Sequence, residues 1–494
     1  MGEQAVHLGT GRDPETAGGL VAPACHAPFS SLYLDPAGRV TACCANTYHP
    51  LGDLRSQTLT EIWRGGPARA LRDRVADGRL DLGCELCAAE VGRGSAATAE
   101  LRRFDPLAPS EADPPWPVQL ELALSNACNL QCTMCNGELS SAIRIHREGR
   151  APLPAVYGDA FFAELDAFLP HLRRLFLLGG EPFLGAEPLR VLDRLVELGL
   201  TPEVFVTTNG TQWSPRIERI LAQLPLDVSV SVDGFQAATV EAIRVGVHHA
   251  DLLRNIERYR EATRAHGGGF SLTFCLQRAN WRELGDVLAW GDELDLLVGV
   301  STLTNPPHLG LHTLAAPALA EVAAGLRAED PRRQAGLRRN RPAWDAAVAR
   351  VEGLLHERVG LAEDGGSVDV LAAAEARAAA FADGRGVHRV HADASQLVVS
   401  VEPDPRDVLG VDLVTLPGGP TRALGERLRA SLGPIVTSAL EVHPDGVEER
   451  RLRFGGPDGA TDVRAFLAPT GPTTHVWLLA ARDAPAGRGV QPGS

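Results

Sequence analysis

Three cysteines stand close together in a spacing that suits metal ligation. Cys128, Cys132 and Cys135 form the pattern C-x3-C-x2-C directly after an apolar, strand-like run. Three thiolates at a strand end can close on one face of an iron–sulfur cube, a group that proteins ordinarily hold with four cysteines. Three local ligands would leave one iron open to a substrate or cofactor, as a catalytic zinc keeps an open position. A zinc site and a set of buried cysteines are the alternatives.

A second group of cysteines precedes this triplet. It consists of Cys25, Cys43, Cys44, Cys84 and Cys87. Gly38 stands between the first two at the predicted turn of a hairpin, where the freedom of glycine to adopt a positive φ is useful. A hairpin and a later C-x2-C can bring four thiolates together. Cys44 is either spare or a substitute for Cys43, and zinc, which C-x2-C also suits, is the alternative metal.

The placement of the cysteines also bears on the cellular compartment. Eight of the nine cysteines precede residue 136. The first residues are polar and lack the apolar core of a secretory signal, and no apolar run reaches the ~20 residues of a membrane helix. We therefore expect a cytoplasmic protein. In that reducing compartment, clustered cysteines bind metal or do chemistry more often than they form disulfides.

Length and charge narrow the class of protein. At roughly 100–200 residues per domain, a chain of 494 residues predicts about three domains. Hydrophobic residues make up 44% of the chain and charged residues 22%, a balance typical of folded globular proteins. The net charge of −14 gives no whole-chain support for binding to nucleic acid or to an anionic membrane, and we expect neither partner.

The cysteine triplet lies at the start of a region in which strands and helices alternate. Strands are predicted at 118–125, 174–180, 203–210, 227–234, 270–277 and 296–304, and amphipathic helices such as 187–198 and 250–263 separate them. Repeated βα units of this kind predict an α/β fold with a parallel sheet. Six strands allow a partial (β/α)6 barrel, but periodicity alone does not distinguish a barrel from an open sheet.

Other segments flank this α/β region. In front of it, apolar residues alternate around a turn at Asp35–Gly38 and predict a hairpin, followed by a helical stretch at 60–76 and a Pro-rich linker at 106–117. Behind it, residues 313–382 predict helices that break near Asp330-Pro331 and Gly365-Gly366. From residue 396 the pattern predicts five strands and a helix at 421–432, an α+β domain that resembles a PAS fold.

The expected domain organisation follows from these patterns. The expected units are a flexible tail (1–20), a small cysteine-rich module with its linker (21–112), the partial barrel (113–312), a helical segment (313–390), the α+β domain (391–485) and a second flexible tail (486–494).

The cysteine triplet resembles the signature of the radical S-adenosylmethionine (radical SAM) superfamily, with Met134 at the hydrophobic position before the last cysteine. Further motifs of that family follow the later strands in the expected order. They are Gly179-Gly180-Glu181-Pro182, which resembles the GGEP motif; Thr208-Asn209-Gly210; Ser231-Val232-Asp233-Gly234; and then Arg244 and Asn255.

The resemblance implies a role for each matched position. Cys128, Cys132 and Cys135 would ligate a 4Fe–4S cluster whose fourth iron binds S-adenosylmethionine. The segment 179–182 would receive the amino group of that cofactor, and Met134 would offer backbone contacts to its adenine. Ser231 and Arg244 would contact it as well, Arg244 at the carboxylate, where a permanent cation suits an anion. The alternatives are a small core-facing residue for Ser231 and a surface helix arginine for Arg244.

The front cysteines resemble the SPASM/twitch auxiliary-cluster module of radical SAM enzymes, placed here before the barrel. The full SPASM form carries more than the five cysteines present here, so the resemblance implies one auxiliary 4Fe–4S cluster. Its implied ligands are Cys25, Cys43, Cys84 and Cys87. A fully ligated cluster would relay electrons or support the structure, whereas an open iron could bind substrate.

The resemblance also implies an activity. A radical SAM enzyme cleaves S-adenosylmethionine reductively and uses the 5′-deoxyadenosyl radical to abstract hydrogen from a substrate, with an electron donor such as flavodoxin or ferredoxin. We expect the substrate to be a peptide that is modified oxidatively, as in RiPP-type maturation. A dehydrogenase or epimerase acting on a small molecule such as a sugar is the alternative. A zinc-stabilised binding protein that has lost catalysis is the non-enzymatic alternative.

Cys275 lies in the predicted strand 270–277, separate from the other cysteines. Apolar residues there alternate with Thr273, Cys275 and Gln277, and this second set can point into a barrel. A thiol in that position could return a hydrogen atom to a substrate radical, as radical SAM peptide epimerases require. The alternative is a small cysteine packed in the core.

Overall fold

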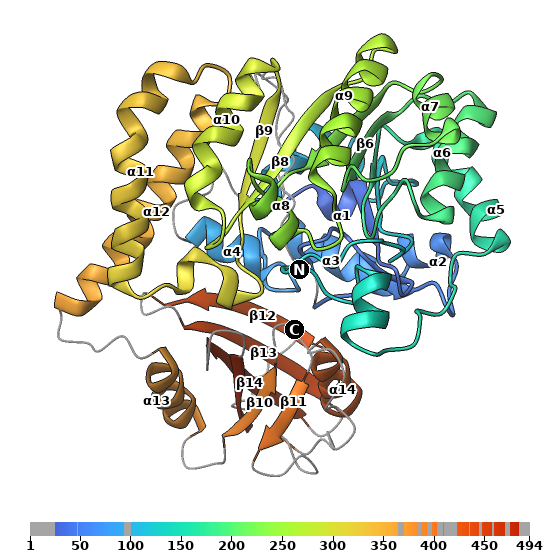
Figure 1. Ribbon diagram of the computed structural model, residues 1–494. Coiled ribbons are helices and arrows are strands. Elements are labelled where there is room, and N and C mark those ends of the chain that lie inside the picture. The colour runs from blue at the N-terminus through green and yellow to red at the C-terminus, as the bar shows by residue number, and fades with distance from the viewer. Residues whose placement is uncertain are drawn as a thin grey trace.

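The computed structural model describes residues 25–46, 48–92, 100–363, 370–382, 387–392, 398–402, 409, 422–433, 435–443, 447–456, 459–469 and 475–483. The tails expected at 1–20 and 486–494, and the helix break expected at Gly365-Gly366, lie outside these residues. Two sheets, one of nine strands and one of six, organise the chain (Figure 1). Among the described helices, none combines the length and the apolar character that crossing a bilayer requires.

The larger sheet has the strand order β3-β2-β1-β4-β5-β6-β7-β8-β9. Its strands are β1 (Ser31–Leu34), β2 (Arg39–Thr41), β3 (Gly52–Asp53), β4 (Gln119–Leu122), β5 (Arg174–Leu177), β6 (Glu203–Thr208), β7 (Leu226–Ser231), β8 (Phe270–Leu276) and β9 (Leu297–Thr302). Strands β4 to β9 are parallel and follow one another in sequence. Because parallel crossovers are right-handed, this order puts every connecting helix on one face of the sheet. The result is the predicted partial barrel, which remains open between its two edges.

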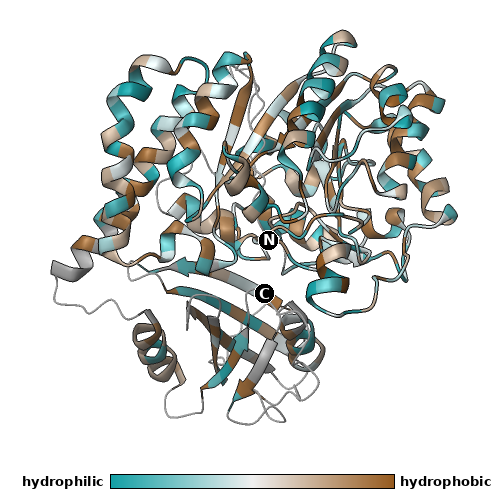
Figure 2. Cartoon of the chain, in the orientation of Figure 1, coloured by the Kyte–Doolittle hydropathy of each residue, from teal (hydrophilic) through white to brown (hydrophobic). Residues whose placement is uncertain are grey.

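The helices of this region surround the outside of the sheet (Figure 1). They are α5 (Asp159–Phe168), α6 (Ala186–Leu198), α7 (Pro215–Leu221), α8 (Ala237–Ile243), α9 (His249–Ala265) and α10 (Leu284–Glu293). The connections also contain the short helical segments η2 (Ile143–Arg147), η3 (Leu169–His171), η4 (Trp281–Glu283), η5 (Pro307–Leu309) and η6 (Leu311–Thr313). Apolar side chains of the strands, such as Leu120, Val206 and Leu272, are at most 1% exposed beneath these helices. Apolar and polar residues accordingly alternate along strands and helices in Figure 2.

The opposite face of the sheet is polar near the centre of the barrel. Strand register aligns Tyr33, Glu121, Phe176 and Phe205 in one row, Thr207, Ser229 and Ser271 in the next, and Ser231 and Thr273 in a third. Hydroxyls pair across the strands, with Oγ–Oγ distances of 3.0 Å for Ser271 and Ser229. A parallel sheet is normally apolar on both faces. This polar face, here called the inner face, is therefore suited to a ligand rather than to core packing.

The front cysteine-rich segment is joined directly to the barrel. It contains α1 (Ala27–Ser30), α2 (Leu59–Trp63), α3 (Gly66–Ala76), α4 (Glu85–Gly92) and the 3-10 helix η1 (Glu100–Leu107) beside its three strands. The predicted hairpin is present, and Gly38 in its turn has φ +90°. β1 pairs in parallel with β4, so the hairpin extends the barrel sheet, and both parts share one apolar core.

Two helices follow the barrel, α11 (Ala316–Gly336) and α12 (Arg341–Glu363). The break predicted near Asp330-Pro331 is wrong, because α11 continues through Pro331. Proline removes one backbone hydrogen bond there, but side-chain contacts hold the flanking turns. Asp330 accepts a hydrogen bond from Trp344 Nε1 at 2.8 Å, and buried Arg333 pairs with Asp286 at 2.7 Å. The helices separate only after residue 336.

The C-terminal part is an antiparallel sheet with the order β11-β10-β15-β14-β13-β12. Its elements are α13 (Val370–Ala382), β10 (His388–Ala392), β11 (Val398–Glu402), α14 (Arg422–Leu432), β12 (Ile435–Val442), β13 (Glu448–Gly456), β14 (Gly459–Pro469) and β15 (His475–Asp483). The helix at 421–432 and five of the strands match the prediction. β10 is absent from the prediction, because it crosses the boundary at residue 390 that was expected between the helical segment and the α+β domain.

This sheet packs against the segment that carries Cys84 and Cys87. The hydroxyl of Ser438 in β12 accepts a hydrogen bond from Gly83 N at 2.9 Å and donates one to Glu85 at 3.0 Å. Arg450 in β13 lies 3.5 Å from Glu85 and stacks over Tyr48. Since Glu85 is only 2% exposed, its carboxylate depends on these partners from the C-terminal sheet.

Candidate functional site

The cysteine triplet forms a compact loop at the carboxyl end of β4. All three thiols are free of disulfides. Burial, together with the neighbouring thiols of the triplet, raises the pKa of Cys132 to about 11 and that of Cys135 to about 12. Cys132 is buried and Cys128 and Cys135 are half-buried. Three such thiols within electrostatic reach of one another, without disulfide partners, are a donor set for a positively charged metal centre, which would stabilise their thiolate forms.

Side chains from the following segment hold this loop in place. Ser141 Oγ accepts a hydrogen bond from Cys128 N at 3.1 Å, and the Arg147 guanidinium donates to the carbonyl oxygen of Cys135 at 2.5 Å. Asn209 Nδ2 lies 3.8 Å from Cys128 Sγ. Sequence reasoning assigned no role to Ser141 or Arg147, since no periodic or motif signal marks them. Hydrogen bonds of this kind orient ligands and tune the metal that they hold.

The glycine motif approaches the cysteine loop closely. Gly180 N donates to Ser125 O at 3.0 Å, and Glu181 N donates to Ala127 O at 2.7 Å. Gly179 has φ +99°, and a Cβ at Gly180 would lie 2.4 Å from Ala127 O. The two glycines are therefore required by the neighbouring protein backbone, in addition to any contact with a cofactor. Pro182 is buried in the same turn.

The Glu181 carboxylate joins two strand ends. It accepts hydrogen bonds from Thr208 Oγ1 at 2.7 Å, Asn209 N at 2.7 Å and Phe183 N at 3.0 Å. Burial raises the pKa of this carboxyl, and the three donors oppose that rise. Because protein groups occupy its carboxylate, any contact of this motif with an amino group would come from its backbone carbonyls. Asn255 extends the network by donating to Gly210 O at 2.9 Å.

Arg244 lies beside the cysteine loop in a buried ion pair. Its guanidinium is 2.7 Å from Asp233 Oδ2, and the two side chains are 10% and 0% exposed. Burial disfavours the charged guanidinium, but Asp233, Cys132 and Cys275 outweigh it and raise the pKa of Arg244. Among the described residues, Arg244 Nε has no hydrogen-bond partner. A buried N–H group that belongs to a permanent cation and lacks a hydrogen-bond partner suits an anionic ligand.

The remaining predicted contacts lie around Arg244. Ser231 Oγ accepts a hydrogen bond from Thr273 Oγ1 at 3.2 Å on the inner face. Cys275 lies two residues after Thr273 in β8, where it pairs in register with Ser301 of β9. Its backbone N–H donates a hydrogen bond to Asp233 Oδ1 at 2.8 Å. Met134 is half-buried in the cysteine loop. The structure thus brings Arg244, Cys275 and the triplet to one end of the barrel.

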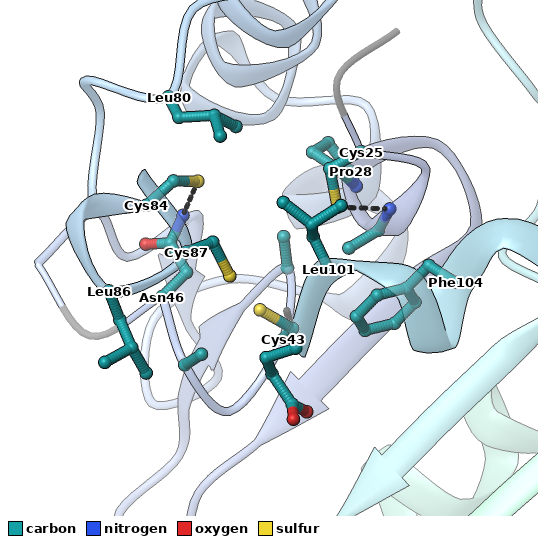
Figure 3. Close-up of a pocket in the computed structure, with 14 residues that line it drawn as sticks. Cys25, Pro28, Cys43, Asn46, Leu80, Cys84, Leu86, Cys87, Leu101 and Phe104 are labelled. Carbon is teal, nitrogen blue, oxygen red and sulfur yellow. Dashed lines mark hydrogen bonds between the residues drawn. The ribbon is translucent and has the colours of Figure 1, made fainter. Parts of the chain in front are cut away.

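The front cysteines surround a second site. Cys25, Cys43, Cys84 and Cys87 line one cavity together with apolar residues, Asn46 and Glu100 (Figure 3). Their thiols come from the start of α1, the end of β2 and the start of α4. Burial raises the pKa of all four thiols, and the charges of neighbouring thiols raise the pKa of Cys84 and Cys87 further. Asn46 Nδ2 donates to Cys84 Sγ at 3.4 Å.

Cys44 does not line this cavity. Its thiol accepts a hydrogen bond from Arg103 at 3.4 Å, and burial raises its pKa to about 12. Adjacent residues of a chain project in different directions, which separates Cys44 from Cys43. Sequence reasoning had left Cys44 open as a substitute ligand and had missed Arg103.

Comparisons with known proteins agree with this arrangement. The family model of the radical SAM superfamily matches residues 122–291, and that of the SPASM iron–sulfur cluster-binding domain matches residues 25–88. The chain therefore contains a radical SAM domain. More particularly, a SPASM-type domain precedes the radical SAM domain, which matches a radical SAM enzyme with an auxiliary-cluster module. These domains imply a 4Fe–4S cluster with S-adenosylmethionine and auxiliary iron–sulfur binding.

Curated relatives match part of the barrel region. GTP 3′,8-cyclase 2 of Pseudomonas aeruginosa is 28% identical over 144 residues, which are 29% of this chain and 41% of that protein. GTP 3′,8-cyclase of Synechocystis sp. is 26% identical over 179 residues, 36% of this chain and 51% of that protein. The chain thus spans about half or less of the length of these relatives.

Solved structures resemble the chain in part. Streptococcus suis SuiB bound to S-adenosylmethionine shares 15% identity, with 56% of this chain and 62% of that chain covered and a TM-score of 0.34. The structure of anSMEcpe with bound AdoMet shares 19% identity, covers 42% of this chain and 58% of that chain, and has a TM-score of 0.33.

Proposed function

We propose that the protein carries out an oxidative radical SAM reaction, with its two groups of thiols as the sites of two clusters. The observation that carries the proposal is their placement, with three thiols beside Arg244 at the carboxyl end of the barrel and four around the front cavity. When bound, the cofactors supply a 5′-deoxyadenosyl radical that abstracts hydrogen and an auxiliary acceptor for electrons. The chain itself must bind the cofactors, place the substrate and exclude water.

We assign the ligands and contacts residue by residue. Cys128, Cys132 and Cys135 hold the cluster that keeps an open iron. Arg244 would hold the carboxylate of S-adenosylmethionine, because its Nε is a buried donor without a partner in the described protein. The backbone of Gly179–Glu181 would receive the amino group, the backbone of Met134 would contact the adenine, and Ser231 would complete the contacts. Cys25, Cys43, Cys84 and Cys87 hold the auxiliary cluster, which leaves Cys44 as a partner of Arg103.

The inner face favours a polar substrate with little net charge. Its central rows carry the hydroxyls of Thr207, Ser229, Ser231, Ser271 and Thr273. The strand register places two described arginines on this face, and both are paired: Arg174 with Glu203 at 2.8 Å and Arg39 with Asp35 at 3.3 Å. Hydroxyls pair well with amide groups. We therefore propose a peptide as the substrate class and oxidative modification, as in RiPP-type maturation, as the outcome.

A small-molecule substrate is the second candidate, and the curated relatives named GTP 3′,8-cyclases favour it. GTP carries several negative charges and requires unpaired cations in its site. Incubating the reconstituted protein with S-adenosylmethionine, dithionite and either a synthetic peptide library or GTP separates the two candidates. Modification of GTP, with the peptides unchanged, would replace the peptide proposal.

Cys275 provides a test of the oxidative outcome. Its position on the inner face near Arg244 would also suit a hydrogen donor, which an epimerase needs. For an oxidative reaction, we expect Cys275→Ala to retain product formation within about twofold, because a strand cysteine of this kind mainly packs. The measurement is mass spectrometry of the product formed in deuterated water, with Ser301→Ala as the matched variant in the same row.

The oxidative product is lighter than the substrate by two hydrogen atoms and carries no solvent deuterium at the reacting carbon. A thiol exchanges its hydrogen with solvent. One deuterium in the product of the unaltered protein, and loss of that product in Cys275→Ala alone, would therefore establish hydrogen return by Cys275 and contradict the oxidative proposal.

A further inference from the structure

One cation lies at the junction between the front cavity and the barrel. Arg103 projects from η1, and its terminal nitrogen donates to Cys44 Sγ at 3.4 Å and to Glu121 Oε1 at 2.7 Å. Its Nε is 2.6 Å from Glu100, a residue that lines the front cavity. Arg103 thus reaches from the cavity wall to β4, the first strand of the barrel.

The partner of Arg103 is a buried carboxylate of the inner face. Glu121 is 0% exposed and lies in β4, seven residues before Cys128, in the row of Tyr33 and Phe176. Gln119 donates to the same carboxylate oxygen at 2.9 Å. Among the described residues, Glu121 Oε2 has no hydrogen-bond partner. A buried charge of this kind is retained at a cost in stability and depends on its counterion.

The field of Arg103 extends into the front cavity. Leu101 and Phe104, its neighbours on η1, line that cavity, and its guanidinium contacts the thiol of Cys44, which adjoins Cys43 in the chain. Glu121 accepts a hydrogen bond from the same nitrogen and carries the opposite charge. The two members of the ion pair therefore act on the cavity with opposite signs.

We propose that the Arg103–Glu121 ion pair sets the reduction potential of the auxiliary iron–sulfur centre. The inference rests on the proposed function, in which the front thiols hold that centre. Reduction adds one negative charge to a cluster, so a nearby cation favours the reduced form and a nearby carboxylate favours the oxidised form. Because Glu121 belongs to the inner face, the pair also connects the charge state of that face to the auxiliary centre.

The test is a redox titration of the reconstituted full-length protein, followed by electron paramagnetic resonance of the signal that S-adenosylmethionine does not perturb. We expect Arg103→Leu to lower the ratio of reduced to oxidised auxiliary centre about tenfold at a given potential, a shift of ~59 mV to more negative values. Glu121→Gln, which removes a charge but keeps the shape, should shift the potential in the positive direction. Arg103→Lys should restore most of the original value.

Arg102→Leu is the matched control, because Arg102 stands on the same helix, is 45% exposed in its side chain and pairs with Asp105 at 3.5 Å. We expect it to change the ratio by less than about twofold, since exposed charges are screened. If the ion pair were only structural, the Arg103 and Glu121 variants would shift the reduction potential in the same direction or leave it unchanged. An unchanged or more negative potential in Glu121→Gln overturns the inference, even if Arg103→Leu assembles poorly. Absence of an auxiliary signal in the unaltered protein would instead overturn the proposed auxiliary site itself.

Discussion

Replacing Cys128, Cys132 and Cys135 together by alanine is expected to abolish formation of 5′-deoxyadenosine from S-adenosylmethionine. The three thiols form one loop at the end of β4 and are the donor set that we assign to the open-site cluster. Without them no iron remains to deliver an electron to the cofactor. The measurement is chromatography of 5′-deoxyadenosine after anaerobic incubation with dithionite.

Cys44→Ala is the matched control for this experiment, since Cys44 is also buried in a cysteine-rich segment but lines neither site. It should retain cleavage of S-adenosylmethionine. The triple variant should also keep the iron of the front site, whose thiols lie just before α1, just after β2 and at the start of α4. Normal 5′-deoxyadenosine formation by the triple variant would remove the basis of the proposed ligand assignment.

Arg244→Leu is expected to lower the free energy of unfolding by about 3–5 kcal/mol, because it leaves the charge of Asp233 buried without its partner. Asp233 is 0% exposed and lies 2.7 Å from the guanidinium. The same variant should lose binding of S-adenosylmethionine, since Arg244 is the cation assigned to its carboxylate. Urea unfolding of the apoprotein and equilibrium binding to the reconstituted protein measure the two effects separately.

Arg254→Leu provides the comparison, because the side chain of Arg254 is 62% exposed and pairs with Asp251 on the same helix. An exposed pair of this kind contributes at most about 1 kcal/mol. Arg244→Lys keeps the charge and should recover part of both properties. If Arg244→Leu were as stable as Arg254→Leu and bound the cofactor normally, Arg244 would have neither role.

The strands of the barrel could be predicted because their apolar runs are regular. β4 to β9 each begin within one residue of the expected position. The choice between a barrel and an open sheet required the strand order, which no single segment contains. Pro331 shows the limit of local rules. Its effect on α11 is outweighed by the contacts of Asp330 and Arg333, which come from residues distant in the sequence.

The candidate site, too, could be predicted from the sequence only in part. Motif spacing predicts the three thiols of the triplet, and the resemblance to the SPASM/twitch module predicts the four thiols assigned to the front site. It could not decide the direction of the Cys44 side chain, nor reveal Arg103 and Glu121, which meet only when η1 packs against β4. It also missed that Ser438 and Arg450, more than 300 residues away, hold the segment that carries Cys84.

The central claim is that this chain holds one open-site cluster and one auxiliary cluster, and iron analysis with Mössbauer spectroscopy after anaerobic reconstitution tests it most directly. The account predicts about eight irons per chain, all in 4Fe–4S clusters. About four irons per chain, with zinc bound by the front cysteines, would contradict it.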